Sequence, residues 1–107
     1  STSPTQPKPM HPLQILATLQ NAYRKYLRLD DPNIRTDSQA VEALGGKVKP
    51  YPAKKVLSQS RKLGSSGLKR AFDLLAQADI DLKGATGQPP EAVIEVLVAR
   101  LARIAVS

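Results

Sequence analysis

The sequence has no cysteine, no tryptophan and only one histidine among its 107 residues. Without cysteine the chain cannot form a disulfide, a thiolate metal site or a cysteine nucleophile. A zinc site normally needs three or four protein ligands, and the lone His11 lies beside a proline-rich start, away from any catalytic partner. We therefore expect no catalytic residue, no metal site and no cofactor, and we do not expect an enzyme.

Aromatic side chains and long apolar runs are also scarce. The aromatic residues are Tyr23, Tyr26, Tyr51 and Phe72, and they are not interleaved with glycines, so a base-stacking surface for nucleic acid is not expected. No apolar run approaches the roughly 20 residues that a membrane span needs, and the start shows no charged-then-apolar leader pattern. Together with the absence of cysteine, this fits a cytoplasmic protein without a membrane partner.

Two local patterns that suggest chemistry have simpler explanations. Asp79 and Asp81 are two residues apart, so on a helix they point in different directions, and no base accompanies them. The glycine–serine–serine–glycine run at 64–67 lacks the P-loop pattern of a phosphate site. A helix stop followed by a capping serine, Ser65 or Ser66, accounts for this run.

Composition divides the chain into two parts. Residues 1–12 contain four prolines and no apolar periodicity, so we expect a flexible proline-rich linker or the remnant of a tag there. Residues 13–107 have apolar residues at three- and four-residue steps and no strand-like alternation, as in a helical domain. The expected helices span approximately 13–29, 36–44, 50–63, 65–82 and 89–105. Their short connections predict an all-α fold, a compact bundle of about five helices.

Local signals set the limits of these helices. Thr36 and Gln39 have the spacing of a capping box, in which each side chain accepts a hydrogen bond from the other residue's backbone N–H. Glycines follow three of the helices, at 45–46, 64 and 84, where the left-handed geometry of a helix end costs glycine little. The last helix is apolar on more than one side, so it lies either at the centre of the core or partly beneath a partner.

Positive charge is in excess, with 16 Lys and Arg against nine Asp and Glu, for a net charge of +7. Such an excess favours an acidic partner, most commonly nucleic acid. The stretch between Ala43 and Phe72 has eight of the basic residues and no acidic one. These residues could contact DNA phosphates or an acidic protein neighbour, or they could form a solvated face. The residues expected at such a contact are Lys54, Lys55, Arg61, Lys62, Lys69 and Arg70.

Three segments stand out within residues 52–104: Arg-Lys-Leu-Gly at 61–64, Leu-Leu-Ala-Gln-Ala-Asp-Ile-Asp-Leu-Lys-Gly at 74–84, and Leu-Val-Ala-Arg-Leu at 97–101. They resemble the C-terminal domain of the delta subunit of the bacterial DNA polymerase III clamp loader, and the resemblance covers essentially all of residues 11–105. The opening of the first helix at 11–13, His-Pro-Leu, also suits that family, and Pro-Ala-Lys-Lys at 52–55 is similar to actinobacterial members. These are helical packing patterns, so their order and spacing carry the match.

The resemblance implies an assembly role. In this family the C-terminal helical domain joins those of four other subunits in a pentameric collar. ATP is hydrolysed by other subunits, and the sliding clamp is opened by an N-terminal domain that this sequence does not include. The implied partners are therefore the ATPase subunits and, within the assembly, primer-template DNA, whereas the sliding clamp is reached only through the N-terminal domain.

Two classes of function follow from these observations. The first is the collar, or oligomerisation, domain of the delta subunit, holding the clamp loader together while it loads the sliding clamp onto primed DNA. The second is a stand-alone basic helical DNA-binding domain, suggested by the basic stretch from Lys47 to Arg70. The residues expected at the subunit interface of the first class are Tyr26, Val93, Val96, Arg100 and Ile104.

Overall fold

A computed structural model describes residues 10–106 of the chain. Within this range all regular structure is helical, as expected, and no strand occurs. The helices are α1 (Pro12–Arg28), α2 (Asp37–Ala43), α3 (Pro50–Leu82) and α4 (Pro90–Val106). The expected linker at 1–12 falls mostly on positions 1–9, which lie outside the described residues, and Pro12 already belongs to α1.

The start of α1 is held by a capping box that the sequence signals did not reveal. The His11 Nδ1 atom accepts a hydrogen bond from the backbone N–H of Leu13 at 3.1 Å. The side-chain oxygen of Gln14 accepts in turn from the His11 N–H at 3.1 Å. Pro12 follows at a position where a missing N–H costs nothing. The one histidine of the chain is therefore a helix cap.

The capping box predicted for α2 is confirmed. The backbone N–H of Gln39 donates to the Thr36 hydroxyl oxygen at 3.1 Å. The Gln39 side-chain oxygen accepts from the N–H groups of Thr36, at 3.1 Å, and Arg35, at 2.7 Å. The cap thus pairs backbone donors that the first turn of a helix leaves without partners.

Replacing Thr36 with alanine is expected to lower the free energy of unfolding by about 1 kcal/mol, because the N–H of Gln39 loses its acceptor. Denaturant unfolding followed by circular dichroism measures the change. The matched control is Ser38→Ala, which removes an exposed hydroxyl from the first turn of the same helix. Equal losses in the two variants would contradict a stabilising cap at Thr36.

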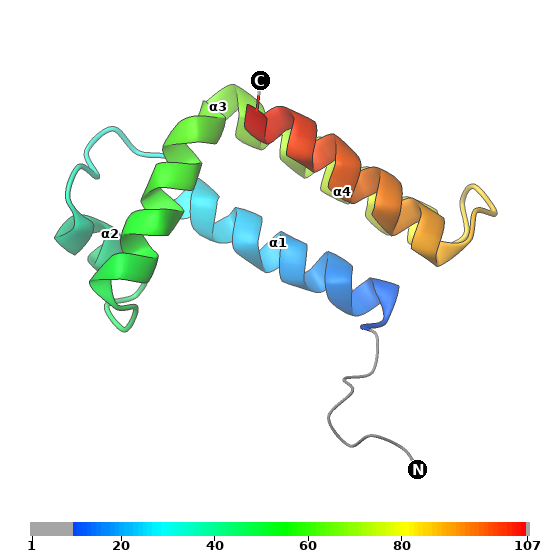
Figure 1. The fold of residues 1–107 in the computed structure, drawn as a ribbon, viewed down its shortest axis with the longest axis horizontal. Helices are drawn as coiled ribbons and strands as arrows, with labels where there is room; N and C mark the ends of the chain where they lie inside the picture. Colours follow the sequence, from blue (N-terminus) through cyan, green and yellow to red (C-terminus); the bar gives the residue numbers. More distant parts are fainter. Residues whose placement is uncertain (1–9, 107) are drawn as a thin grey trace, which may run out of the picture.

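The two helices expected on either side of Gly64 follow one another without a loop and together form α3. Gly64 has φ 65° and ψ 175°, a conformation adopted almost only by glycine, and α3 changes direction sharply along its length (Figure 1). The helical geometry is therefore interrupted at Gly64 as expected, and counting the kinked α3 as one element gives four helices. The prediction of a serine cap was wrong. Ser65 and Ser66 already have helical geometry, which an N-cap residue lacks, and the Ser65 hydroxyl donates to Asp30 Oδ2 at 2.7 Å.

The kinked helix is the central element of the fold, because α3 contacts each of the other helices. Its N-terminal half lies beside α2, and its C-terminal half runs along α4, with α1 completing a three-helix bundle (Figure 1). The main core fills this bundle with aliphatic side chains from the three helices. Its most deeply buried members are Leu16, Leu68, Ala71, Leu75, Leu97 and Leu101.

A smaller core lies at the α2 end of the molecule. It contains Leu29, Ile34, Ala40, Ala53 and Leu57. The polar side chain of Ser60, only 1% exposed, donates to the main-chain carbonyl of Tyr26 at 2.7 Å. This hydrogen bond satisfies a buried hydroxyl and ties the first half of α3 to α1.

Candidate interaction surfaces

The basic residues of α3 are divided by the kink into separate groups. Before it, Lys54, Arg61 and Lys62 line a shallow depression together with Leu57, Ser58 and Asp37. Asp37 comes from the first turn of α2, so a carboxylate lies within this basic depression. The structure therefore brings together three of the six residues expected at a DNA or acidic-partner contact, and it adds a negative charge among them.

Two of the basic side chains before the kink have partners within the fold. The Arg61 guanidinium donates to the main-chain carbonyl of Ile34, in the connection between α1 and α2. The Lys55 ammonium lies 4.9 Å from the centre of the Tyr51 ring, a cation–π distance. Arg61 thus has a structural role, which the sequence pattern alone did not indicate.

The remaining pair of expected basic residues follows the kink, and both are exposed. Arg70 lines a second depression with Asp73 and Leu74 of α3 and with Arg100, Arg103 and Ile104 of α4. Arg70 is thereby placed with arginines that lie about 30 residues away in the sequence, a grouping that charge counting along the chain could not find. Lys69 is not among the residues of this depression.

The residues expected at a subunit interface fall into two groups. Val93 and Ile104, with 9% and 8% of their surface exposed, belong to the main core of this chain, so they have little area left for a partner. Val96 is 47% exposed and Arg100 is also exposed, so both side chains can contact a partner. Tyr26 is half-buried, and its ring packs edge-on against Tyr23 with 5.1 Å between the ring centres.

Tyr23 and Tyr26 form the aromatic part of the α1 surface that packs on the core. Burial, together with a smaller contribution from Tyr26, raises the pKa of Tyr23 above its ordinary value of 10.0. The Tyr23 phenol is therefore neutral in the folded protein at neutral pH. Its role is packing, as the apolar stripe of the first helix indicated.

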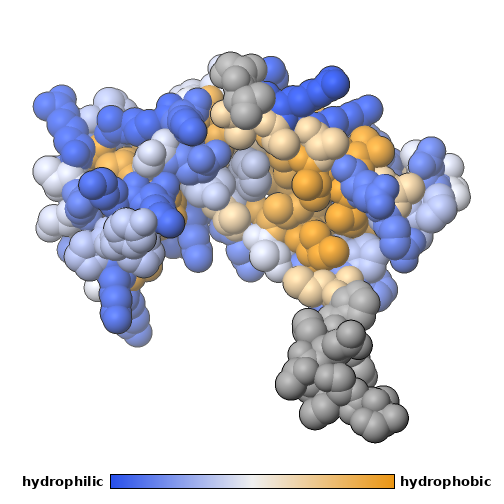
Figure 2. Space-filling view, in the orientation of Figure 1, coloured by the Kyte–Doolittle hydropathy of each residue, from blue (hydrophilic) through white to orange (hydrophobic). Residues whose placement is uncertain are grey.

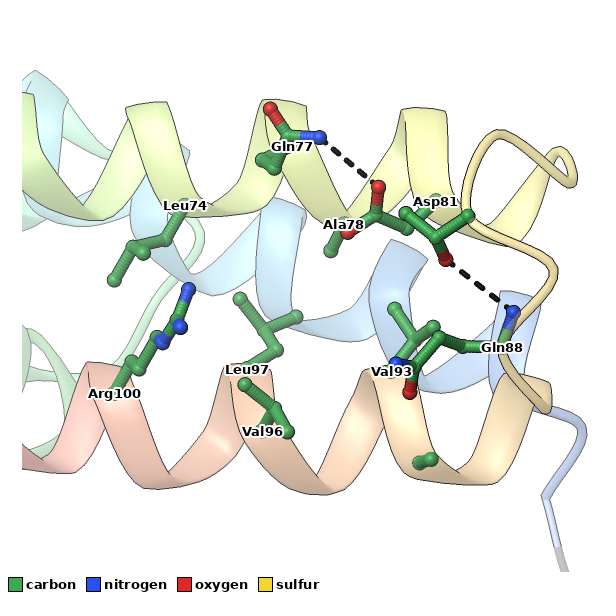
Figure 3. Close-up of a pocket in the computed structure, with 11 residues that line it drawn as sticks. Leu74, Gln77, Ala78, Asp81, Gln88, Val93, Val96, Leu97 and Arg100 are labelled. Atoms are coloured by element: carbon green, nitrogen blue, oxygen red, sulfur yellow. Dashed lines mark hydrogen bonds between the residues drawn. The ribbon is translucent and has the colours of Figure 1, made fainter.

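A further hollow of the surface is a groove between the C-terminal half of α3 and α4, which we call the α3–α4 groove. Leu74 and Ala78 line it from α3, and Val96, Leu97 and Arg100 from α4, around a volume of about 250 Å³ (Figure 3). Its far end is polar. There the Gln77 amide donates to Asp81 Oδ1 at 2.9 Å, and the backbone N–H of Gln88 donates to the Thr86 hydroxyl at 3.3 Å.

A second apolar surface lies over α1 and α4. Figure 2 shows hydrophobic side chains gathered there on one face, with hydrophilic side chains around them. The large apolar side chains that these helices leave exposed include Leu13, at 53%, and Val98, at 47%. Half-buried Ile15 and Leu19 of α1 pack against the core beside them. A continuous apolar surface of this kind is typical of a protein–protein contact.

The described part of the chain shows no grouping of residues suited to metal binding. Among residues 10–106, no three His, Asp or Glu side chains lie together as metal ligands would. Asp79, considered above for catalysis, forms an ion pair with Lys83 at 3.0 Å. Within the same range, no helix combines the length and apolar character required to cross a membrane.

The fold and these surfaces define a small helical domain with exposed apolar and basic areas. Comparison with protein families matches residues 7–101 to the DNA polymerase III delta subunit, C-terminal domain. The chain belongs to this family, which confirms the resemblance expected for residues 11–105 as far as residue 101. No curated protein and no solved structure gives a significant match to the chain.

Proposed function

We propose that this domain is the collar domain of a clamp-loader delta subunit and joins the C-terminal domains of the other subunits. The supporting observation is the apolar surface over α1 and α4, which a monomer would leave in water. Membership of the delta C-terminal family is consistent with a clamp-loader role. The partners are then the ATPase subunits, and the domain works in the cytoplasm without chemistry of its own.

Apolar burial supplies most of the association energy in this proposal. Val96 and Val98, each 47% exposed, would lose apolar surface to a partner at roughly 25 cal/mol per Å². The two side chains point to different sides of α4, because successive helical residues are about 100° apart. One partner could therefore cover the face shown in Figure 2, and another could meet the α3–α4 groove.

Substituting Val98→Asp is expected to weaken binding of the chain to the ATPase subunits by about tenfold or more, because a carboxylate would have to be desolvated in an apolar contact. Binding is measured by calorimetry with the purified ATPase subunits. Tyr51→Asp is the matched control, since Tyr51 is 67% exposed at the opposite end of the molecule. Melting followed by circular dichroism checks that both variants are folded.

Two results would count against the collar function. One is that the unmodified chain does not bind the ATPase subunits, and the other is that Val98→Asp binds as tightly as Tyr51→Asp. Salt-sensitive binding to a primer-template duplex without any subunit binding would favour the second candidate, a stand-alone DNA-binding domain. The grouping of Lys54, Arg61 and Lys62 supports that candidate, whereas Asp37 in the same depression and the engagement of Arg61 by Ile34 weaken it.

A further inference from the structure

The basic depression beside Arg70 adjoins the α3–α4 groove. Leu74 and Arg100 line both hollows, and we call the two adjoining hollows together the channel. In Figure 3 the Arg100 side chain reaches from α4 across this channel toward Leu74 of α3. Along α4 the channel runs from Ala92 to Ile104, which is about 18 Å at the helical rise per residue.

One end of the channel has an excess of positive charge. Arg70, Arg100 and Arg103 meet there, and Asp73 is the one carboxylate among the residues that line this end. None of these arginines forms an ion pair with a carboxylate in the described part of the chain, where the ion pair found is that of Lys83 with Asp79. Three guanidinium groups therefore face solvent with their hydrogen-bond donors available to a ligand.

The floor of the basic end is apolar. Leu74 is half-buried and Ile104 is 8% exposed, and they line this end together with the three arginines. Further along the channel, Ala78, Val96 and Leu97 continue the apolar lining. A ligand that fills the channel must therefore combine negative charge at one end with apolar groups along its length.

We propose that this channel docks an acidic, apolar-anchored peptide segment of a neighbouring subunit. Its carboxylates would pair with Arg70, Arg100 and Arg103, and its apolar side chains would lie on Leu74 and along the groove. This proposal rests on the proposed collar function, because it takes the partner to be a clamp-loader subunit. It adds the chemistry of the partner segment and the residues that recognise it.

The lining favours a peptide over nucleic acid. A phosphate backbone would use the arginines and leave the apolar floor uncovered, whereas a peptide can satisfy both. Arginine pairs carboxylates through two parallel hydrogen bonds, and aliphatic side chains beside it exclude water from those bonds. About 18 Å of channel accommodates five or six residues of extended chain, or a few turns of helix.

The test measures binding of the full chain to the purified ATPase subunits by calorimetry at low and moderate salt. In Arg70→Glu/Arg103→Glu, binding is expected to weaken about tenfold or more, because the new glutamates would face the carboxylates of the partner segment. The matched control, Lys25→Glu/Arg28→Glu, makes the same change in net charge at exposed positions of α1 and is expected to alter binding less than twofold. Arg70→Gln/Arg103→Gln should give an intermediate loss and a weaker dependence on salt.

The outcomes separate this proposal from the collar function. If the unmodified chain binds the subunits and the arginine variants bind equally well, the proposal of an acidic peptide segment is overturned while the collar function stands. If the unmodified chain does not bind them, both are overturned. If the arginine variants lose affinity for a primer-template duplex but keep affinity for the subunits, the channel recognises nucleic acid and the peptide proposal is wrong. Melting of each variant, followed by circular dichroism, checks that a variant with weaker binding is still folded.

Discussion

Replacing Leu75 with alanine is expected to lower the free energy of unfolding by about 2–5 kcal/mol, the range found for buried leucines. Leu75 is 2% exposed and lies in the main core that α1, α3 and α4 form. Removing its branched end takes away apolar burial and leaves a cavity that the packed helices can close only in part. Chemical denaturation measures the loss, which is a large fraction of the stability typical of a domain this size.

The matched control for this experiment is Ile80→Ala, in the same half of α3. Ile80 is 50% exposed, so its truncation removes little buried surface and is expected to change stability by less than about 0.5 kcal/mol. A small effect at Leu75, comparable to that at Ile80, would show that the three helices are not packed around this residue as the structure describes.

Replacing Gly64 with alanine is expected to cost about 1–3 kcal/mol through backbone strain. Apart from its own neighbours along the helix, no atom lies within 4 Å of where a β-carbon would be, so the cost comes from the positive φ of 65° and not from a clash. To relieve the strain, α3 would have to straighten, and its two halves would lose their separate contacts with α2 and α4. Thermal melting should show a clear drop, by about 4–8 °C for each kcal/mol.

Gly67→Ala is the control, three residues further along the same helix. Gly67 has no positive φ, and its added β-carbon would meet Ile104 at 3.4 Å and Leu63 at 3.5 Å, close to ordinary contact distances. Alanine also favours the helical state by roughly 0.5–1 kcal/mol over glycine. We expect Gly67→Ala to stay within about 1 kcal/mol of the unmodified chain. A similar loss in the two variants would show that the kink does not depend on glycine geometry.

The fold was predictable where a short-range rule decides the conformation. The Thr36–Gln39 box involves residues three apart and forms as expected. The sequence also predicted that Gly64 interrupts the helix, but it did not predict that helical geometry resumes at Ser65 without a cap. A glycine can end a helix or bend it, and the choice depends on tertiary contacts on either side, such as the hydrogen bond from Ser65 to Asp30.

The interaction surfaces were harder to predict from the sequence than the helices, because they depend on which helices pack against each other. Arg70 and Arg103 are distant in sequence, and only the packing of α3 on α4 places them in one depression. Val93 and Ile104 illustrate the converse. Both lie on an apolar helix with several apolar sides, and the pattern could not separate the side that faces the core from the side left open.

The division of α3 into two halves has a consequence for local unfolding of the domain. The smaller core beside α2 includes two alanines among its five buried residues, so it buries less apolar surface than the main core. Amide hydrogens of α2 should therefore exchange with solvent before those of α1, α4 and the second half of α3. The α3–α4 groove is lined by residues of α4 and of the second half of α3, where exchange is expected to be slower. Substitutions around α2 can therefore accumulate without disturbing the groove.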